Sequence, residues 1–415
     1  MRKTKILLIG NSSCVNRGDA AILDGLIHGI KEVTNKNNIE ITATSVQYFE
    51  SRILLKYPLE PDFSYSIKPK LFGEFSLLNK IRNKYFLFLE ILILSFFAKN
   101  GSKFIPRRFR EVSKNIEAYD IVIQVGGSYF VDLYTPMKYI SVAISILLKK
   151  PIFFAGHSIG PFESWKSKLI PRLLFNKVDK IYLREEESMK YISSLNTDYS
   201  NISISGDTAW LIAESKRTLI FHEEVKTSKP LIAITVRDLK PFDKRLNIKQ
   251  EEYENLYVDV LNELIREGYH IIAVSMGTGF GKYAHDDRIP AFRIKSKLEN
   301  CNEMTVLVNE YNHLEVGYIL SNCDLLIGTR LHSVILSMRY NTPAIAVYYE
   351  HKSLGILNKM GFEKNSFFIK DIGNDLFNIK VKDILNNQIK YRIIVEEKVN
   401  QERKLGLKML TEIFK

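Results

Sequence analysis

Short runs of consecutive apolar residues alternate along the chain with stretches whose apolar residues recur at helical spacing. In the first half, the apolar runs are KILLIG, DIVIQVGG, PIFFAGHSIGPF, KIYLREEES and NISISGDTAWL. In the second half, they are PLIAITVRD, HIIAVSMGTG, CDLLIG and PAIAVYYEHK. Strands that are apolar throughout are typical of parallel sheets covered by helices on both faces. The pattern therefore predicts an α/β fold.

A polar stretch near residues 214–229 divides this alternation into two series. We expect two Rossmann-like, doubly wound lobes, one over 1–215 and one over 228–385. A charged helical segment over 386–415 is expected to pack across both lobes. Because ligands of such sheets bind at the carboxyl ends of the strands, we expect the site in a central cleft between the lobes.

The first predicted strands end in glycine and small polar residues. In GNSSCVNRGDAAIL, Asn16 and Asp19 precede a helix, but the spacing is not the G-x-G-x-x-G of a dinucleotide site. Asp19 is equally suited to capping that helix. Gly126 and Gly127 follow the strand in VGGSYFVD, either as a tight turn or as a place where a ligand approaches the backbone. His157, in GHSIGPF, ends another strand, where a structural role competes with a substrate contact.

Three arginines come directly after predicted strands, namely Arg184, Arg237 and Arg330. One such arginine would indicate a surface ion pair, but three indicate convergence on an anion, because the planar guanidinium matches carboxylate and phosphate oxygens. Arg330 and His332 fall in the predicted first turn of a helix, where free N–H groups favour an anion. An imidazole there can transfer a proton near neutral pH. The alternative is a capped helix with a hydrogen-bonded core histidine.

Two further stretches predict less chemistry. AHDDR (284–288) contains candidate metal ligands, but adjacent residues rarely all bind one ion and no second cluster completes a set, so we expect no metal. MGTGFG (276–281) lacks the Lys-Ser/Thr ending of a nucleotide P-loop, and we expect only a mobile loop.

Composition and charge narrow the function classes. The 415 residues suit two domains, and the net charge of +12 favours acidic partners. No zinc-finger spacing or aromatic–basic repeat indicates nucleic acid. Three scattered cysteines exclude a disulfide framework. The apolar stretch near the first residue is too short for a signal peptide, so we expect a cytoplasmic protein.

The longest apolar run, over residues 85–98, has an unusual setting. Its 14 residues are fewer than the roughly 20 that span a bilayer. The surrounding segment 80–114 contains nine lysines or arginines and two acids. Such a segment suits the surface of an anionic membrane, although a core helix with solvated ends fits equally well.

These segments, taken in order, resemble the polysaccharide pyruvyl transferase family over about residues 6–360. The sharpest part of the resemblance is RLH followed by TPAIAVYYEHK. The resemblance implies a two-lobed, GT-B-like fold with the acceptor bound by the first lobe and the donor by the second. It also implies transfer of a pyruvyl group from phosphoenolpyruvate to a sugar of a cell-surface glycan or its lipid-linked precursor. By this resemblance a cyclic ketal would form, phosphate would be released, and no cofactor would be needed.

The resemblance also implies roles for single residues. Arg330 and His332 would contact the donor, with His332 as the acid, and Arg184 and Arg237 would be further donor contacts. Asn16, Asp19 and Asp207 fall in matching motifs and would serve the acceptor or the structure. This chain departs from the family pattern at three positions that bear on acceptor identity: Ala20, Ser128 and His157.

Two other functions stay open at this point. A glycosyltransferase of the same architecture could hold the diphosphate of a nucleotide sugar in the same basic pocket. A non-catalytic glycan-binding module would use the arginines and the histidine for binding alone. If the acceptor is lipid-linked, we expect the protein at the inner face of the membrane.

Overall fold

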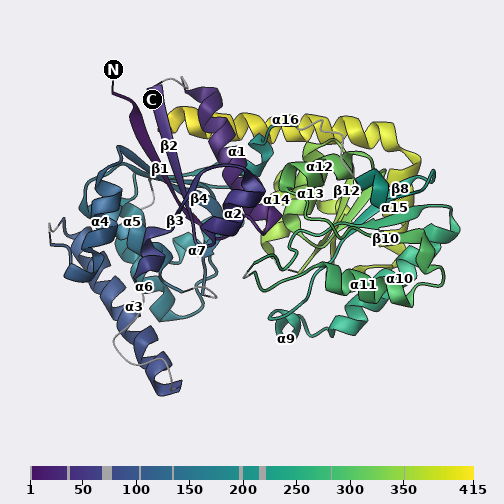
Figure 1. The fold of residues 1–415 in the computed structure, drawn as a ribbon, viewed down its shortest axis with the longest axis horizontal. Helices are drawn as coiled ribbons and strands as arrows, with labels where there is room; N and C mark the ends of the chain where they lie inside the picture. Colours follow the sequence, from purple (N-terminus) through teal and green to yellow (C-terminus); the bar gives the residue numbers. More distant parts are fainter. Residues whose placement is uncertain are drawn as a thin grey trace. The chain divides into compact units, whose positions relative to one another are not determined.

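The structure of the protein is a computed structural model that describes residues 2–34, 38–67, 77–101, 104–132, 135–195, 200–214, 221–281, 283–349 and 351–415. The chain divides into two compact units (Figure 1). Unit 1 comprises Met1–Ser13, Leu26–Thr208 and Leu405–Lys415, and unit 2 comprises Cys14–Gly25 and Ala209–Lys404. Each unit is built around one parallel sheet.

Unit 1 contains a seven-stranded parallel sheet in the order β3-β2-β1-β4-β5-β6-β7. The strand order reverses between β1 and β4, which is the topological switch point of a doubly wound sheet. The strands are β1 (Thr4–Asn11), β2 (Ile39–Ser45), β3 (Leu59–Pro61), β4 (Ile121–Phe130), β5 (Ile152–Ile159), β6 (Lys180–Leu183) and β7 (Ile202–Ile204).

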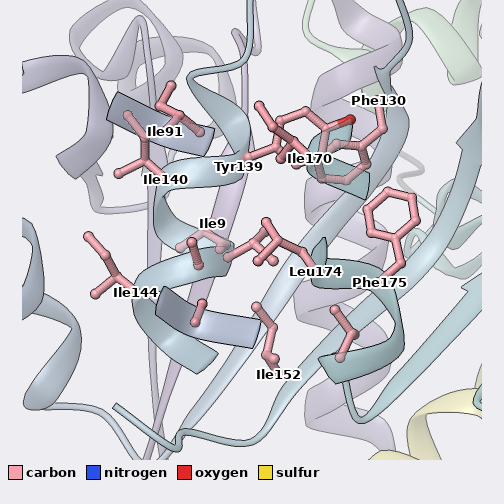
Figure 2. Packing of buried hydrophobic residues seen from close by; sticks show 14 of the residues in the cluster. Ile9, Ile91, Phe130, Tyr139, Ile140, Ile144, Ile152, Ile170, Leu174 and Phe175 are labelled. Atoms are coloured by element: carbon pink, nitrogen blue, oxygen red, sulfur yellow. The ribbon is translucent and has the colours of Figure 1, made fainter. Parts of the chain in front are cut away.

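The helices of unit 1 cover this sheet and bury its apolar side chains. Figure 2 shows Ile91, Ile140 and Ile170 among the buried side chains that pack together there. Each such side chain contributes about 1.5–3 kcal/mol when it leaves water. The α-helices that begin or lie in this part of the chain are α1 (Arg17–Val33), α2 (Tyr48–Leu55), α3 (Leu77–Lys99), α4 (Arg110–Glu117), α5 (Lys138–Leu147), α6 (Trp165–Leu174) and α7 (Glu187–Ser193).

Unit 2 contains a six-stranded parallel sheet in the order β10-β9-β8-β11-β12-β13. Its switch point lies between β8 and β11. The strands are β8 (Leu231–Thr235), β9 (His270–Ala273), β10 (Met304–Val306), β11 (Leu325–Gly328), β12 (Ala344–Tyr348) and β13 (Ser366–Phe368).

The helices of unit 2 include the first turns of α1, because Cys14–Gly25 belongs to this unit. A capping box at Asn312 begins α12, in which the Glu315 carboxylate accepts a hydrogen bond from the Asn312 amide. The α-helices from residue 221 onward are α8 (Phe221–Glu224), α9 (Asp243–Leu246), α10 (Gln250–Arg266), α11 (Arg288–Lys297), α12 (His313–Ser321), α13 (Leu331–Arg339), α14 (His351–Lys359), α15 (Asp375–Asn386) and α16 (Gln388–Ile413). The last nine residues of α16, from Leu405, belong to unit 1.

Short 3-10 helices connect several of these elements. They are η2 (Phe63–Ser66), η3 (Arg107–Phe109), η4 (Phe175–Lys177), η5 (Thr208–Leu211), η6 (Cys301–Glu303), η7 (Glu363–Asn365) and η8 (Ile369–Asp371). Within the described part of the chain, no helix is both long enough and apolar enough to cross a membrane.

The two parallel sheets confirm the predicted α/β fold with doubly wound topology. One strand differs from the prediction at a candidate site. Gly126 and Gly127 do not follow β4 but lie inside it, because the strand continues to Phe130. Gly127 adopts φ 138°, and the pairing of β4 with β5 shifts register between Gly127 and Phe130. The pair of glycines therefore marks an irregularity within the strand rather than its end.

Candidate active site

Arg330 and His332 lie where β11 passes into α13, at the carboxyl end of the strand. Arg330 is the N-cap residue of α13, with φ −95° and ψ 116°, and its side chain makes no capping bond. It therefore precedes the first turn, which corrects the expectation that it lies within that turn. His332 is the second residue of the helix and is half-buried.

The turn that carries these two residues is held rigidly. The hydroxyl of Thr329 is 2.9 Å from the Tyr253 hydroxyl and 2.8 Å from the Tyr257 hydroxyl. The Ser333 hydroxyl donates to the Arg330 carbonyl at 2.6 Å. Because these partners are buried, the backbone on either side of Arg330 is fixed before any ligand binds.

Arg330 forms an ion pair with Asp287, whose side chain is buried. Arg330 donates from Nε to Oδ2 at 3.2 Å and from Nη2 to Oδ1 at 2.5 Å. Oδ2 of Asp287 also accepts from the amides of Met276 (3.2 Å) and Gly277 (3.1 Å). Among the described residues, Nη1 of Arg330 has no hydrogen-bond partner, so the guanidinium keeps one donor edge for a ligand.

The charge of Arg330 is secured by its surroundings. Burial lowers the pKa of this guanidinium, but Asp287, followed by Tyr283 and Tyr349, more than offsets that effect. The pKa of Arg330 therefore lies above its ordinary value. Its side chain is still 14% exposed, which leaves it accessible to a ligand.

Arg237 follows β8, the neighbour of β11 across the switch point, and is 5% exposed. Its guanidinium lies over the rings of Phe242 (4.9 Å) and Tyr349 (4.7 Å), donates to the Tyr349 hydroxyl, and donates to the Asp238 carbonyl at 2.9 Å. Within the described chain, no carboxylate forms an ion pair with Arg237. A buried cation without a counter-charge is costly unless an anion binds beside it.

Tyr283 and His285 lie in the field of both arginines. Burial raises the pKa of Tyr283 to about 12, with Arg330 and Arg237 lowering it and the charges of Asp19 and Asp287 raising it. Burial, then Arg330 and Arg237, lowers the pKa of His285. The His285 imidazole is therefore neutral near pH 7 and offers a neutral polar group beside the two cations.

His332 packs against the first turn of α1. A Cβ added to Gly18 would lie 2.8 Å from Cγ and from Nδ1 of His332, so glycine at this position lets the ring approach the backbone. Asn16 Oδ1 accepts from the Gly18 amide at 3.0 Å. Asp19 lies inside α1, which corrects the expectation that it could be the N-cap residue. The charge of Asp19 instead helps to raise the pKa of Tyr283.

Arg17, a residue that the sequence did not single out, fixes this turn to unit 2. Its side chain is buried and donates to the carbonyls of Tyr311 (2.7 Å) and Val15 (2.5 Å) and to Glu310 Oε2 at 2.6 Å. Its amide donates to the Met276 carbonyl at 2.8 Å. These bonds position Asn16, Gly18 and Asp19 beside the strand ends of unit 2.

Arg184 has a different role in unit 1. It donates from Nη1 to Asp207 Oδ2 at 2.6 Å, from Nε to Ser158 Oγ at 2.8 Å, and from Nη2 to Ser128 Oγ at 3.0 Å. Both partners of the ion pair are buried, with side chains 3% and 0% exposed. Two of the predicted site residues, Arg184 and Asp207, are therefore partners of each other.

His157 lies in β5 and is fully buried among the rings of Phe130 (5.4 Å between centroids), Phe154 (5.3 Å) and Tyr129 (6.5 Å). Burial, then the charge of Arg184, lowers the pKa of His157 to about 3, against a smaller opposing effect of the backbone at Gln124 and Val125. The ring is therefore neutral near pH 7. In this structure His157 is a core residue of unit 1.

Lys138 is a second residue that the sequence did not single out. Its buried ammonium donates to the Gly10 carbonyl at 2.6 Å and lies 4.7 Å from the centre of the Tyr129 ring. Gly10 belongs to β1, at the switch point of the sheet of unit 1. Lys138 thus supplies positive charge where doubly wound sheets bind ligands.

The predicted site residues fall into two sets. Unit 2 brings together Asn16, Asp19, Arg237, Arg330 and His332, and unit 1 contains Gly126, Gly127, His157, Arg184 and Asp207. That both sets serve one site stays a prediction.

The loop after β9 supplies the residues of unit 2 that sequence reasoning missed. It folds back through a bridge between Thr278 and Asp286, and the Gly279 amide donates to the His285 carbonyl at 2.9 Å. The acids of the AHDDR stretch serve arginines: Asp286 pairs with Arg288, and Asp287 with Arg330. From the sequence, AHDDR indicates only a set of metal ligands, with no metal expected there. Nothing in that stretch indicates that Asp287 pairs with Arg330.

Comparisons with known proteins identify the family of the chain. The sequence profile of the family described as "Polysaccharide pyruvyl transferase" matches residues 16–351. The amylovoran biosynthesis protein AmsJ of Erwinia amylovora is 35% identical over 421 residues, which covers 99% of either chain.

Solved structures share the fold at low sequence identity. A protein described as a UDP-N-acetylglucosamine 2-epimerase from Listeria monocytogenes has a TM-score of 0.60 at 12% identity and covers 98% of this chain and 94% of its own. The UDP-GlcNAc 2-epimerase of Methanocaldococcus jannaschii has a TM-score of 0.59 at 13% identity, covering 100% and 99%. The spinosyn rhamnosyltransferase SpnG has a TM-score of 0.54 at 9% identity, covering 99% of each. These likenesses concern the fold alone and confirm the expected GT-B-like class.

The match to the family covers most of the chain and includes the turn of Arg330 and His332 and the first turn of α1. The relative named for amylovoran biosynthesis matches over 99% of its length. The chain therefore belongs to the polysaccharide pyruvyl transferase family and is a transferase.

Proposed function

We propose that the protein transfers a pyruvyl group from phosphoenolpyruvate to a saccharide, with the donor bound at the strand ends of unit 2. The observation that carries the proposal is Arg237, a buried guanidinium without an ion-pair partner in the described chain, beside Arg330 at the switch point. Phosphoenolpyruvate carries a carboxylate and a phosphate. Two guanidinium groups with planar donor edges match these two anionic groups.

His332 is the proposed acid. It lies in the first turn of α13, where the backbone N–H groups and the helix dipole also favour an anion. Protonated His332 gives its proton to the methylene carbon of the donor, which leaves an oxocarbenium-like centre at the adjacent carbon. A saccharide hydroxyl attacks that carbon, and its proton passes to the phosphate as the bond between that carbon and the phosphate oxygen breaks and phosphate leaves. A second hydroxyl then closes the cyclic ketal, and its proton restores His332.

The fixed surroundings of Arg330 support this chemistry. Asp287 and two backbone amides hold one side of the guanidinium, so the ligand meets a donor that is already oriented. The neutral imidazole of His285 keeps further positive charge out of the cluster. Such preorganised donors stabilise the charge that develops on the departing phosphate.

The acceptor we propose is a sugar of a cell-surface glycan, carried on a lipid-linked precursor at the cytoplasmic face of the membrane. Membership of the polysaccharide pyruvyl transferase family and a relative named for amylovoran biosynthesis support a role in glycan biosynthesis. Asn16 and Asp19, which are fixed beside His332 by Arg17, are the proposed acceptor contacts in unit 2.

The experiment that tests the proposal incubates the protein with a panel of saccharide acceptors and either phosphoenolpyruvate or nucleotide sugars. We expect phosphate release with phosphoenolpyruvate, together with an acceptor mass gain of one pyruvate minus water. Nucleotide release with a hexose mass gain would instead establish a glycosyltransferase. Binding of acceptors without product from any donor would establish a glycan-binding module.

A further inference from the structure

The outer face of α3 is apolar and exposed, which is unusual for a helix of a water-soluble protein. Phe86, Leu89, Ile93 and Phe96 recur at helical spacing and are 42–56% exposed. The opposite face of the same helix is buried in the core of unit 1 against α5 and α6 (Figure 1). The helix therefore exposes a second apolar face in addition to the one that packs in the core.

Aromatic rings extend this surface at both ends. Tyr85 is 60% exposed, and Lys166 lies 5.5 Å from the centre of its ring and 5.7 Å from that of Trp165. Trp165, at the start of α6, is 67% exposed. Phe104 is also exposed, and its ring lies 5.4 Å from that of Phe97. We call Tyr85, Phe86, Leu89, Ile93, Phe96 and Trp165 the α3 surface.

A pocket of about 570 Å³ adjoins the α3 surface. Tyr85 belongs to both, Lys166 lines the pocket next to Trp165, and apolar side chains line much of the rest, including Phe88, Phe162 and Ile170. Asp132, a polar residue of the lining, accepts from the amides of Glu163 (2.8 Å) and Ser164 (3.2 Å) and so holds the entry to α6. The pocket has the size and the apolar lining of a site for a small apolar ligand.

Positive charge flanks the α3 surface. Lys99, Arg107, Arg110 and Lys166 are exposed, while the acid within the helix, Glu90, pairs with Arg108. Exposed tryptophan and tyrosine with basic neighbours are typical of surfaces that contact the headgroup region of a membrane. Charge, apolar area and the exposed tryptophan and tyrosine together match an anionic bilayer.

We propose that unit 1 docks on a bilayer containing anionic phospholipid through the α3 surface, and that the pocket between α3 and α6 receives a hydrocarbon chain from that bilayer. The helix lies in the interface and does not cross the membrane. The proposal deepens the proposed function, on which its biological purpose depends, because it places the transferase where a lipid-linked acceptor is found. Binding to the bilayer itself requires neither donor nor acceptor.

The first test measures co-sedimentation of the full-length protein with vesicles of phosphatidylcholine, with and without phosphatidylglycerol. We expect binding that depends on phosphatidylglycerol and weakens with salt. The variant Leu89→Gln/Ile93→Gln keeps helix propensity and removes two apolar contacts, and its partition coefficient should fall about 100-fold.

A matched control carries the same change on another helix. Ile389 and Ile393 of α16 have the same spacing and are 78% and 61% exposed. Ile389→Gln/Ile393→Gln should bind vesicles like the unaltered protein. Equal loss in both variants, or no vesicle binding by the unaltered protein, overturns the proposal. If the unaltered protein is a dimer without lipid and Leu89→Gln/Ile93→Gln is a monomer, a second copy covers this face. That result also overturns the proposal.

The second test addresses the pocket with a phosphatidylcholine that carries a diazirine in its acyl chain. After photolysis, we expect label on the peptide containing Phe162 and Ile170, as read by mass spectrometry. Ser167→Trp fills the pocket from its half-buried edge, and it should remove that label while vesicle binding persists. Label confined to residues 89–96 shows that the chain stays in the bilayer and overturns the pocket assignment. Because both tests omit substrates, their failure leaves the proposed reaction standing, and the donor assay can fail while they succeed.

Discussion

Arg184 of unit 1 and Arg237 of unit 2 follow parallel strands in the same way, yet their guanidinium groups are used differently. Arg184 is paired with the buried carboxylate of Asp207 and two serine hydroxyls. Arg237 is as deeply buried but lies over two aromatic rings, with no carboxylate paired to it in the described chain. The same sequence feature therefore stabilises the fold in one unit and leaves a positive charge for a ligand in the other.

Arg330 is intermediate between the two. Arg330 pairs with a carboxylate, that of Asp287, just as Arg184 pairs with Asp207. Unlike Arg184, it keeps a donor edge and partial exposure, as a ligand contact requires. A strand-end arginine is therefore a candidate ligand contact when its neighbours leave part of its charge or one of its donor groups unpaired. We therefore expect substitution of Arg184 to lower stability, and substitution of Arg237 or Arg330 to lower activity.

Removing Arg184 should produce the largest effect on folding. Arg184→Ala leaves Asp207 buried without its counter-charge, which should lower the free energy of unfolding by about 3–5 kcal/mol. Urea denaturation at pH 7 measures it. Arg237→Ala serves as the control, because it leaves no carboxylate unpaired and should cost about 1 kcal/mol. Equal losses in the two variants would contradict the comparison.

Removing the imidazole of His332 should have the largest effect on turnover. His332→Ala removes the proposed acid, and kcat should fall about 10³-fold, because general acid catalysis contributes on that scale. The free energy of unfolding should change little, since the ring is half-buried. His222→Ala, at an exposed histidine of α8, should leave kcat unchanged. Substantial turnover by His332→Ala would refute the acid role.

Removing Arg237 should lower the affinity for the donor more than it lowers the stability of the fold. A hydrogen bond to a charged group contributes about 2 kcal/mol, so Arg237→Ala should raise the Kd of phosphoenolpyruvate roughly 30-fold. Isothermal titration calorimetry measures the affinity. An unchanged Kd, with the protein folded, would exclude Arg237 from the anion site.

The burial of His157 predicts a pH dependence of stability that belongs to unit 1. Its pKa is about 3 in the fold and about 6.5 when unfolded, so the unfolded chain binds the proton more tightly. The stabilisation is complete above pH 6.5 and declines as the pH falls toward 3, by about 2 kcal/mol between pH 7 and pH 5.

His157→Gln removes this titration while keeping a polar side chain in the core. The variant should lose less stability than the unaltered protein when urea denaturation at pH 7 and pH 5 is compared. The readout is the difference between the two pH values, so any constant cost of the substitution cancels. Parallel losses in both proteins would show that His157 is protonated in the fold as readily as in solution.

The apolar pattern predicted the central strands and the positions of Arg237, Arg330 and His332, because buried parallel strands are continuously apolar and their ends are visible in the sequence. It did not reveal β2, nor the outer strands β3, β10 and β13. Each of these three outer strands has only three residues. Three residues give no period to read, and an edge strand packs on fewer neighbours.

The partners of the arginines could not be predicted in the same way. Asp287, Tyr283 and His285 lie on a loop that folds back through a single bridge, so their distance from Arg330 along the sequence gives no sign of contact. Likewise, the pairing of Arg184 with Asp207 depends on side chains from β5, β6 and the segment after β7 meeting at one edge of the sheet. Sequence reasoning identified which side chains carry charge, and the fold decides which charges cancel.

The smallest predicted effect concerns the close contact between Gly18 and the imidazole ring of His332. In Gly18→Ala, the added methyl would meet the His332 ring at about 2.8 Å, so either the ring or the first turn of α1 must shift. A displacement below 1 Å should lower kcat about tenfold and leave the Kd of phosphoenolpyruvate unchanged, because the arginines do not move. Steady-state kinetics measures the first and calorimetry the second. The same change in the His332→Ala background should have no further effect on kcat, since there is no ring to displace. An equal loss in both backgrounds would mean that Gly18 acts on the fold of α1 and not through His332.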